Sequence, residues 1–266
     1  KPIARVMHII LNMCFFTLTI TGLPLKFNDE EWSKAVIGFL GGANVAGTIH
    51  RTAAAILITL FSGAIVMSIR FLLNPKHGKN VWARLMSPDS LWPRKQDWYD
   101  FRDMFKWFLD MGPMPKFDRW TYWEKFDFLA VFWGMFAIGI SGLILWMPEV
   151  TAKFLPGWIF NVAIIVHSDE ALLATGFIFT VHFFNTHFIP TKFPMDTVIF
   201  TGRIQKYKFL EEKPLYYERL ERDGRLEKNK GGAPDILTNL FSSVIGILFL
   251  TTGIVLTVLI VISLLT

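Results

Sequence analysis

Three of the six histidines lie in one apolar stretch, VHSDEALLATGFIFTVHFFNTHF, which runs from Val166 to Phe188. Two more, His8 and His50, lie in or at the start of other apolar runs, and His77 lies in a polar loop. An imidazole is costly in an apolar segment unless its nitrogens are bonded, and it is a common ligand of haem iron and other metals. The histidines are therefore the first candidates for chemistry.

Spacing along a helix separates the three histidines of this stretch. His167 and His182 are 15 residues apart, which is about 22 Å along an α-helix and about 60° around its axis. We therefore expect them on similar sides of the helix, near opposite edges of a hydrocarbon core about 30 Å thick. His187 follows His182 by five residues, or about 140° around the axis, and is expected to point elsewhere.

Apolar run length predicts the elements that position these residues. Since a span needs about 20 mostly apolar residues, five membrane-spanning helices are expected, at Ile3–Leu23, Gly47–Leu73, Phe126–Met147, Val166–Ile189 and Ile236–Leu265. Prolines lie just past the ends of the first four and are interpreted as helix stops, at Pro24, Pro75, Pro148 and Pro190. The predicted fold class is all-α, a transmembrane helical bundle.

Lys and Arg are distributed unevenly between the two sides of these spans. The N-terminus and the segments 74–125 and 189–235 carry 22 of them, against three in the loops 24–46 and 148–165, with two more at helix ends. The positive-inside rule then predicts a multi-pass protein of the bacterial inner membrane with a cytoplasmic N-terminus. This topology accounts for the formal net charge of +5 better than binding to nucleic acid does.

Topology arranges four histidines as two pairs of equal depth. The first span runs outward, so His8 near its start is close to the cytoplasm. The second and fourth spans run inward, so His50 and His167 near their starts are close to the outside and His182 near the end of the fourth is close to the cytoplasm. The pairs of equal depth are therefore His50 with His167 and His8 with His182. Two imidazoles at one depth on two helices are what a six-coordinate haem iron requires. The sequence therefore predicts two haem b groups. The other interpretation is hydrogen bonding between helices.

Cysteine use restricts the cofactors further. Cys14 is the only cysteine, and the sequence has no Cys-x-x-Cys-His motif. This excludes a disulfide framework, a thiolate metal cluster and a covalently attached c-type haem on this chain. Small residues near the histidines, among them Gly47, Ala53 and Ala55, leave room for a flat macrocycle or allow close helix packing.

Around these histidines the chain resembles the di-haem cytochrome b subunit, the gamma subunit, of membrane-bound formate dehydrogenases, whose relatives serve nickel–iron hydrogenases and thiosulfate reductases. The resemblance covers roughly residues 1–200 and rests on His8 and on GTIHRTAAAIL, WTYWEKFDFLAVFWGMFAIGISGLILW and HSDEALLATGFIFTVH. The segment KFPMD, at Lys192–Asp196, is similar to members that work with multihaem c-type cytochromes.

The resemblance implies the same two ligand pairs and a quinone, menaquinone or ubiquinone, that reacts near the inner haem. His187 and Asn185 lie at that end of the fourth span and are the candidates for the quinone pocket, although His187 is equally suited to capping the helix end. The family has a Tyr-Asn-x-x-Gln-Lys pattern before its third span, where this chain has WTYWEK. Glu124 is therefore either a proton-handling group of that pocket or part of an interfacial ion pair.

Positive side chains near the ligands have two interpretations. Arg5 and Arg51 lie three and one residues from predicted ligands, and they either pair with haem propionates or extend to the membrane edge. The stretch from Gln96 to Phe128 is dense in aromatic and charged residues and predicts an amphipathic helix before a turn at Gly112-Pro113. Its polar and aromatic faces favour a surface or a headgroup contact over catalysis.

The predicted organisation is a four-helix di-haem domain (1–200), a cytoplasmic charged segment (201–235) and a fifth transmembrane helix (236–266). That helix either docks a partner or anchors the charged segment, which is expected to form a solvated helix with a glycine at its end. We predict an electron-transfer subunit of a larger oxidoreductase complex. Its partners are the lipid bilayer, a quinone, and either a periplasmic multihaem cytochrome c or iron–sulfur dehydrogenase subunits. The alternatives are a haem-free membrane anchor and a small transporter or proton-path subunit.

Overall fold

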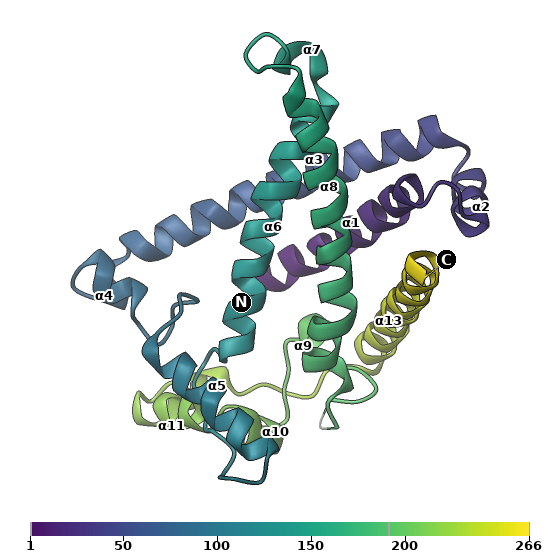
Figure 1. Ribbon diagram of the computed structural model, residues 1–266. Coiled ribbons are helices and arrows are strands. Elements are labelled where there is room, and N and C mark those ends of the chain that lie inside the picture. Colours follow the sequence, from purple (N-terminus) through teal and green to yellow (C-terminus); the bar gives the residue numbers. More distant parts are fainter. Residues whose placement is uncertain (1, 191, 266) are drawn as a thin grey trace. The chain divides into compact units, whose positions relative to one another are not determined.

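The computed structural model describes residues 2–190 and 192–265, and every regular element within them is a helix (Figure 1). Five helices are long and apolar enough to cross a membrane: α1 (Pro2–Lys26), α3 (Ala43–Leu73), α6 (Tyr122–Trp146), α8 (Trp158–Phe177) with a continuation to Phe188, and α13 (Ile236–Leu265). The all-α transmembrane fold and the number of spans agree with the sequence.

Four of the five spans begin before their predicted first residue, and the fourth span differs most. The fourth begins at Trp158 rather than Val166, because the residues after Pro156-Gly157 are themselves apolar and continue the helix. His167 therefore lies nine residues into the span and not at its start. Pro24 lies inside the last turn of α1, because its backbone angle is helical and the ring removes only one hydrogen bond there. Pro148 opens α7 (Pro148–Thr151), where its missing N–H costs nothing.

The remaining elements are short helices between the spans. They are α2 (Glu31–Phe39), α4 (Val81–Leu85), α5 (Lys95–Phe108), α9 (Val198–Thr201), α10 (Lys206–Glu212), α11 (Pro214–Arg222) and α12 (Leu226–Asn229), with a 3-10 turn at Pro75–His77. The predicted amphipathic helix is α5.

Contacts within the chain define two units. The first comprises residues 1–63, 131–202 and 236–266, and the second comprises residues 64–130 and 203–235. This grouping differs from the predicted division at 200 and 235. The fifth spanning helix belongs with the first unit, and the loop between the second and third spans belongs with the charged segment.

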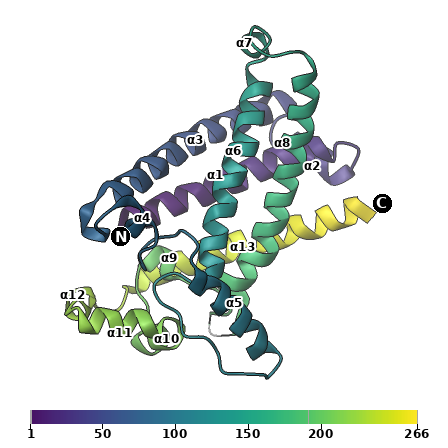
Figure 2. The same ribbon diagram turned by 60° about the vertical axis from the view of Figure 1, so that its left-hand side comes forward.

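An aromatic core in the first unit includes the fifth span. Phe16 of α1 and Phe179 of the fourth span are buried in it together with Leu250 of α13. The ring of Phe249 stacks on Phe16 with centroids 4.7 Å apart, and Figure 2 shows α13 passing beside the end of the fourth span, which it contacts at Ile178–His182. At its far end, Ser263 accepts a hydrogen bond of 3.0 Å from Trp32 of α2. The fifth span is therefore an integral part of the first unit.

The second unit has a smaller core under α11. Tyr217 and Leu220 of that helix are buried, and so is Phe117, whose carbonyl accepts a bond of 3.1 Å from the Leu215 N–H. The expectation of a fully solvated helix here is therefore wrong, because one face of α11 is apolar and packs. Gly224 follows the helix at φ +63°, the left-handed conformation that glycine adopts without strain. The expected single helix up to Gly231-Gly232 is therefore divided here into α11 and α12.

Candidate functional site

The fourth span changes helix type where its second histidine lies. Residues Ile178–His182 and Phe184–Phe188 form two consecutive π-helical segments, which continue α8. Hydrogen bonds in a π-helix join residues five apart, so more residues complete each turn and the rotation per residue is smaller than in an α-helix. The α-helical offset of about 60° between His167 and His182 is therefore an overestimate.

The same segments bear on His187. Five residues of a π-helix complete slightly more than one turn, and His187 is close enough to His182 for the two imidazoles to interact electrostatically. The side to which His187 points relative to His182 stays a prediction.

His50 of α3 and His167 of α8 face one another. Their ring centroids lie 6.2 Å apart, with an angle of 68° between the planes. Because a metal–imidazole bond is about 2 Å long, imidazoles on opposite faces of one iron have ring centres about 6 Å apart. The separation of the two rings is the one that axial ligation of a single metal ion requires, and ligation by this pair stays a prediction.

Hydrogen bonds determine which nitrogen of each ring carries its proton. The Thr21 hydroxyl donates to the Thr17 carbonyl at 2.6 Å, so its contact of 2.9 Å with His50 Nδ1 requires the imidazole to donate. His167 Nδ1 lies 2.9 Å from the Ile138 carbonyl, which can only accept. Both rings therefore present the Nε2 lone pair for a metal, with Nδ1–H held as is usual for metal-bound histidines.

Two glycines make room for these imidazoles. A Cβ on Gly22 of α1 would lie 3.1 Å from His50 Cε1, and one on Gly142 of α6 would lie 2.9 Å from His167 Cε1. Sequence reasoning missed Gly22 and Gly142, and it also missed Thr21. The sequence feature that could have identified them is the presence of small and hydroxyl residues on other spans at the depth of the histidines.

Two apolar grooves lie between the spans. One of about 520 Å³ between α1 and α3 is lined by residues that include Met7 and the small residues Ala55 and Gly63. Another of about 300 Å³ between α6 and α8 includes Ser141 and Ala163, and Ser141 Oγ is 3.4 Å from His167 Nδ1. Among the residues that the structure describes, no histidine lines either groove, and use of the grooves by a macrocycle stays a prediction.

The candidates of the second predicted pair lie near one another and near His187. His8 of α1 is within electrostatic range of both His182 and His187. Its Nδ1 is shielded from solvent and has no hydrogen-bond partner among the described residues. A buried polar atom of this kind normally has a partner, so an imidazole with bonding capacity remaining fits the predicted ligand role.

His187 has a different environment from the other histidines. Its Nδ1 accepts a hydrogen bond of 3.2 Å from the backbone N–H of Asp196, so in the neutral ring Nε2 carries the proton. It is thus a hydrogen-bond donor rather than a metal ligand. Asp196 ends the KFPMD segment, which is therefore attached to the fourth span, and Asn185 lies half-buried in the same π-helical segment as His187.

The two candidate arginines lie in unlike surroundings. Arg5 Nη1 donates to the Phe200 carbonyl at 2.8 Å, and its guanidinium packs against Gly202. Arg5 therefore attaches α1 to the C-terminal end of α9. Arg51 is exposed on α3, with its guanidinium beside Gly47. Pairing of either side chain with a haem propionate stays a prediction.

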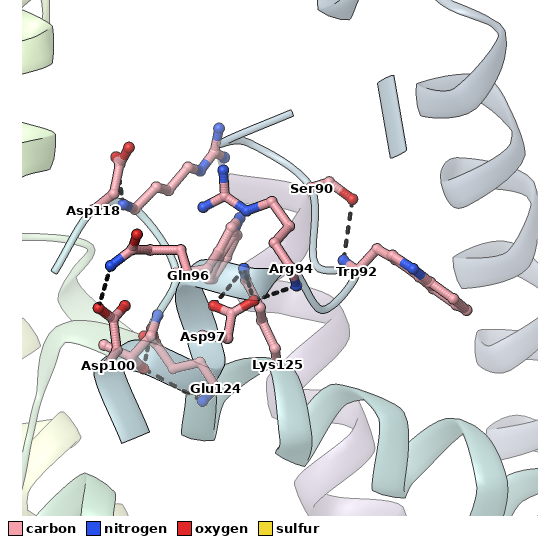
Figure 3. A network of polar contacts seen from close by, with 12 residues as sticks. Ser90, Trp92, Arg94, Gln96, Asp97, Asp100, Asp118, Glu124 and Lys125 are labelled. Atoms are coloured by element: carbon pink, nitrogen blue, oxygen red, sulfur yellow. Dashed lines mark hydrogen bonds and ion pairs between the residues drawn. The ribbon is translucent and has the colours of Figure 1, made fainter. Parts of the chain in front are cut away.

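Glu124 belongs to a polar network at the start of α6 (Figure 3). Its Oε2 accepts bonds of 2.7 and 2.8 Å from the N–H and hydroxyl of Thr121, a capping arrangement that satisfies the first turn of the helix. Lys213 forms an ion pair with the same oxygen. Glu124 thus has the ion pair that the sequence left open, and its part in a quinone pocket stays a prediction.

A buried ion pair lies next to this cap. Lys125 is only 1% exposed, and its Nζ donates to both Asp97 carboxylate oxygens at 2.7 and 2.8 Å. Figure 3 shows the Lys125 side chain directed at Asp97, which also accepts the N–H of Arg94 at the start of α5. This pair attaches α5 to the first turn of α6.

Comparison with models of known protein families gives no match for this sequence, and no curated protein matches it. Within residues 2–190 and 192–265, no group of three or more His, Cys, Asp or Glu side chains could hold a metal ion. A haem iron takes only two axial ligands from the protein, so the paired histidines are the arrangement to test.

Proposed function

We propose that the protein is the membrane cytochrome b subunit of a larger oxidoreductase complex, and that it transfers electrons through two b haems between a periplasmic redox partner and the quinone pool. The observation that carries the proposal is the pair His50 and His167. Their rings are 6.2 Å apart, and each Nδ1–H is engaged by a neighbouring oxygen. Four histidines on three apolar helices at two depths extend this arrangement to two haems.

The residues of the chain orient and insulate the cofactors. Bound haem supplies one-electron transfer, at a potential that depends on its ligands, its burial and nearby charge. Thr21 and the Ile138 carbonyl hold the His50 and His167 rings in the tautomer that can bind iron. The apolar spans keep water from the pair, which strengthens the electrostatic effect of every nearby group.

At the other end of the fourth span, His187 is suited to contact a quinone. Its Nε2–H can donate to a quinone carbonyl oxygen, while the Asp196 N–H holds the ring in place. Asn185 in the same π-helical segment offers an amide as a second donor. Menaquinone or ubiquinone would be the exchangeable substrate, next to the pair His8 and His182.

The distribution of Lys and Arg supports an inner-membrane protein with a cytoplasmic N-terminus. His8 and His182 then lie on the cytoplasmic side and the pair His50 and His167 on the periplasmic side. The external partner is a multihaem cytochrome c or an iron–sulfur dehydrogenase subunit, and the resemblance of KFPMD favours the first.

The visible spectrum of the purified protein tests the proposal. The dithionite-reduced minus oxidised spectrum should show a b-type signal that corresponds to two haems per chain. His50→Ala and His167→Ala should lose the same haem and keep the other, whereas His77→Ala in the loop should keep both. If the wild-type protein shows no b-type signal, the chain is a haem-free anchor or transporter subunit and the proposal fails.

A further inference from the structure

In α5 carboxylate side chains are buried and aromatic side chains are exposed, which is the reverse of a helix on the surface of a water-soluble protein. Its buried residues are Asp97, Asp100 and Met104. The large aromatic residues are exposed instead: Trp98 by 65%, Phe101 by 46%, Phe105 by 60% and Phe108 by 69%. These four, here called the aromatic stripe, are spaced by three, four and three residues, so they line one face of the helix.

Hydrogen bonds on the buried side hold the helix in this rotation. Both Asp97 oxygens accept from Lys125, and Asp100 Oδ1 accepts from Gln96 Nε2 at 2.8 Å (Figure 3). Turning the aromatic stripe inward would break a buried ion pair and expose both carboxylates. The outward direction of the stripe is therefore a fixed property of the second unit and not a choice of side-chain rotamer.

The same ion pair fixes the level of α5 relative to the membrane. Lys125 lies in the first turn of α6, which is long and apolar enough to span a bilayer. The end of a spanning helix lies where the hydrocarbon meets the headgroups. A helix attached at this point has its exposed side chains at the interface, where aromatic rings are favoured.

Positive charge lies along one edge of the aromatic stripe. Lys95, Arg102 and Lys106 are exposed, and at about 100° per residue they share one narrow arc of the helix next to the stripe. Arg102 and Lys106 also pair with Asp103, at 2.8 and 3.6 Å, so the three cations have one carboxylate beside them. The Arg102 guanidinium lies over the Tyr99 ring, 5.3 Å from its centroid. Apolar rings beside long basic side chains are the pattern of helices that lie on an anionic lipid surface.

We infer that α5 is an interfacial helix, with the aromatic stripe in the outer part of the hydrocarbon and with Lys95, Arg102 and Lys106 on the phosphates of anionic lipid headgroups. A water-soluble partner would have to cover the stripe at the end of a membrane span, where lipid is already present. The inference depends on the spanning character of α6 and not on haem, so it stands or fails separately from the proposed function.

Spin labels on the full chain test the inference. In a Cys14→Ser background, Phe101→Cys and Phe105→Cys place a label on the stripe, and Asp103→Cys places one on another face of α5, where Asp103 is 40% exposed. In nanodiscs that contain phosphatidylglycerol, collision with oxygen relative to a water-soluble nickel complex should be several-fold higher at 101 and 105 than at 103. Phe108→Cys replaces either stripe variant that does not fold.

Each other outcome overturns the inference. Equal access of the nickel complex to stripe and control would show that the stripe faces water. Low access of both reagents at the stripe would show that protein covers it, either a partner subunit or a second copy. The Lys95→Gln, Arg102→Gln and Lys106→Gln triple variant should lower the oxygen-to-nickel ratio at 105 in phosphatidylglycerol and not in phosphatidylcholine. An unchanged ratio in both lipids would show that the three basic side chains do not contact the headgroups.

Discussion

At the scale of single residues, three histidines in a similar apolar setting differ by the group that bonds to Nδ1. His50 and His167 donate from Nδ1 to oxygens, which leaves Nε2 able to bind a metal. His187 instead accepts at Nδ1 from a backbone N–H, which makes Nε2 a donor. Residue type and position alone would not separate ligands from hydrogen-bond donors, because the difference comes from partners on other segments of the chain.

Thr21 offers a test of this distinction. Thr21→Val removes an oxygen that accepts from the His50 ring, which also lies in hydrogen-bond range of the Leu18 carbonyl; loss of such a partner typically lowers metal affinity by about 10–100-fold. If His50 binds a haem as proposed, that haem should bind more weakly and have a higher reduction potential, since the imidazole becomes a poorer electron donor. Potentiometric titration of the b-type band measures both.

The matched control for Thr21 is one helical turn away. Thr17 also donates to a backbone carbonyl, that of Met13, at 2.8 Å. It serves as the control because its side chain is not one of those described above beside a histidine. Thr17→Val should leave both haems and their potentials unchanged. Equal shifts in the two variants would mean that the hydroxyl of Thr21 acts only on the helix and not on His50.

At the scale of elements, the contact between α6 and His167 depends on Gly142, where a side chain would come too close to the imidazole ring. Gly142→Ala would place a Cβ 2.9 Å from the ring, closer than such atoms normally come, so the imidazole must move away from Ile138. We expect loss of the haem that His50→Ala also loses, measured by the reduced spectrum. Gly139→Ala on the same helix meets nothing within 4 Å and should retain both haems.

The fifth span gives a second test at this scale, on stability. A Cβ on Gly253 of α13 would lie 2.6 Å from Phe183 and 2.9 Å from Phe179, both buried. Overpacking of this kind costs about 1–3 kcal/mol, so Gly253→Ala should lower the melting temperature in detergent. Gly176→Ala on α8 meets nothing within 4 Å and should be neutral or stabilising, because alanine favours a helix over glycine. A lower melting temperature in both variants would contradict the packing role of α13.

Hydropathy was sufficient to predict the five spans, because bilayer thickness imposes their length. Depth from topology was sufficient to expect His50 near His167, and their rings lie 6.2 Å apart, but that they share one haem stays a prediction. The π-helical segments could not be predicted, since they depend on how the fourth span packs against its neighbours. Gly142, Thr21 and the Ile138 carbonyl were missed for a related reason: each acts on a residue of another helix.

At the scale of the whole molecule, the two units depend on different forces. The first consists mostly of apolar spans and an aromatic core. The second depends on ion pairs around α11, where Arg219 Nη2 lies 3.0 Å from Asp89 and 2.8 Å from Asp118. Arg119 adds a contact of 3.1 Å to Asp89. Charge state should therefore affect the second unit more than the first.

Because Asp89 takes part in these ion pairs, the stability of the second unit depends on pH. Burial alone would raise the pKa of Asp89, but hydrogen bonds and charge from Arg219 and Arg119 hold that pKa below its usual value of 3.8. A depressed carboxyl pKa contributes stability that is complete above the unfolded pKa and is lost as the pH falls through the folded one. Acidification from pH 7 should therefore leave the contribution of Asp89 to the stability of the second unit unchanged until the pH is below about 4.

Asp89→Asn isolates that contribution. At neutral pH the variant should destabilise the second unit by about 2 kcal/mol, because two charged guanidinium groups then meet a neutral amide oxygen in place of a carboxylate. Hydrogen exchange of peptides from residues 86–120 and 214–222 measures this loss. Glu227→Gln, which removes only the exposed pair with Lys230, should not change the exchange. Below the folded pKa, wild type and Asp89→Asn should exchange alike, since Asp89 is then neutral in both states; a difference that persists there would mean that packing, and not charge, stabilises the unit.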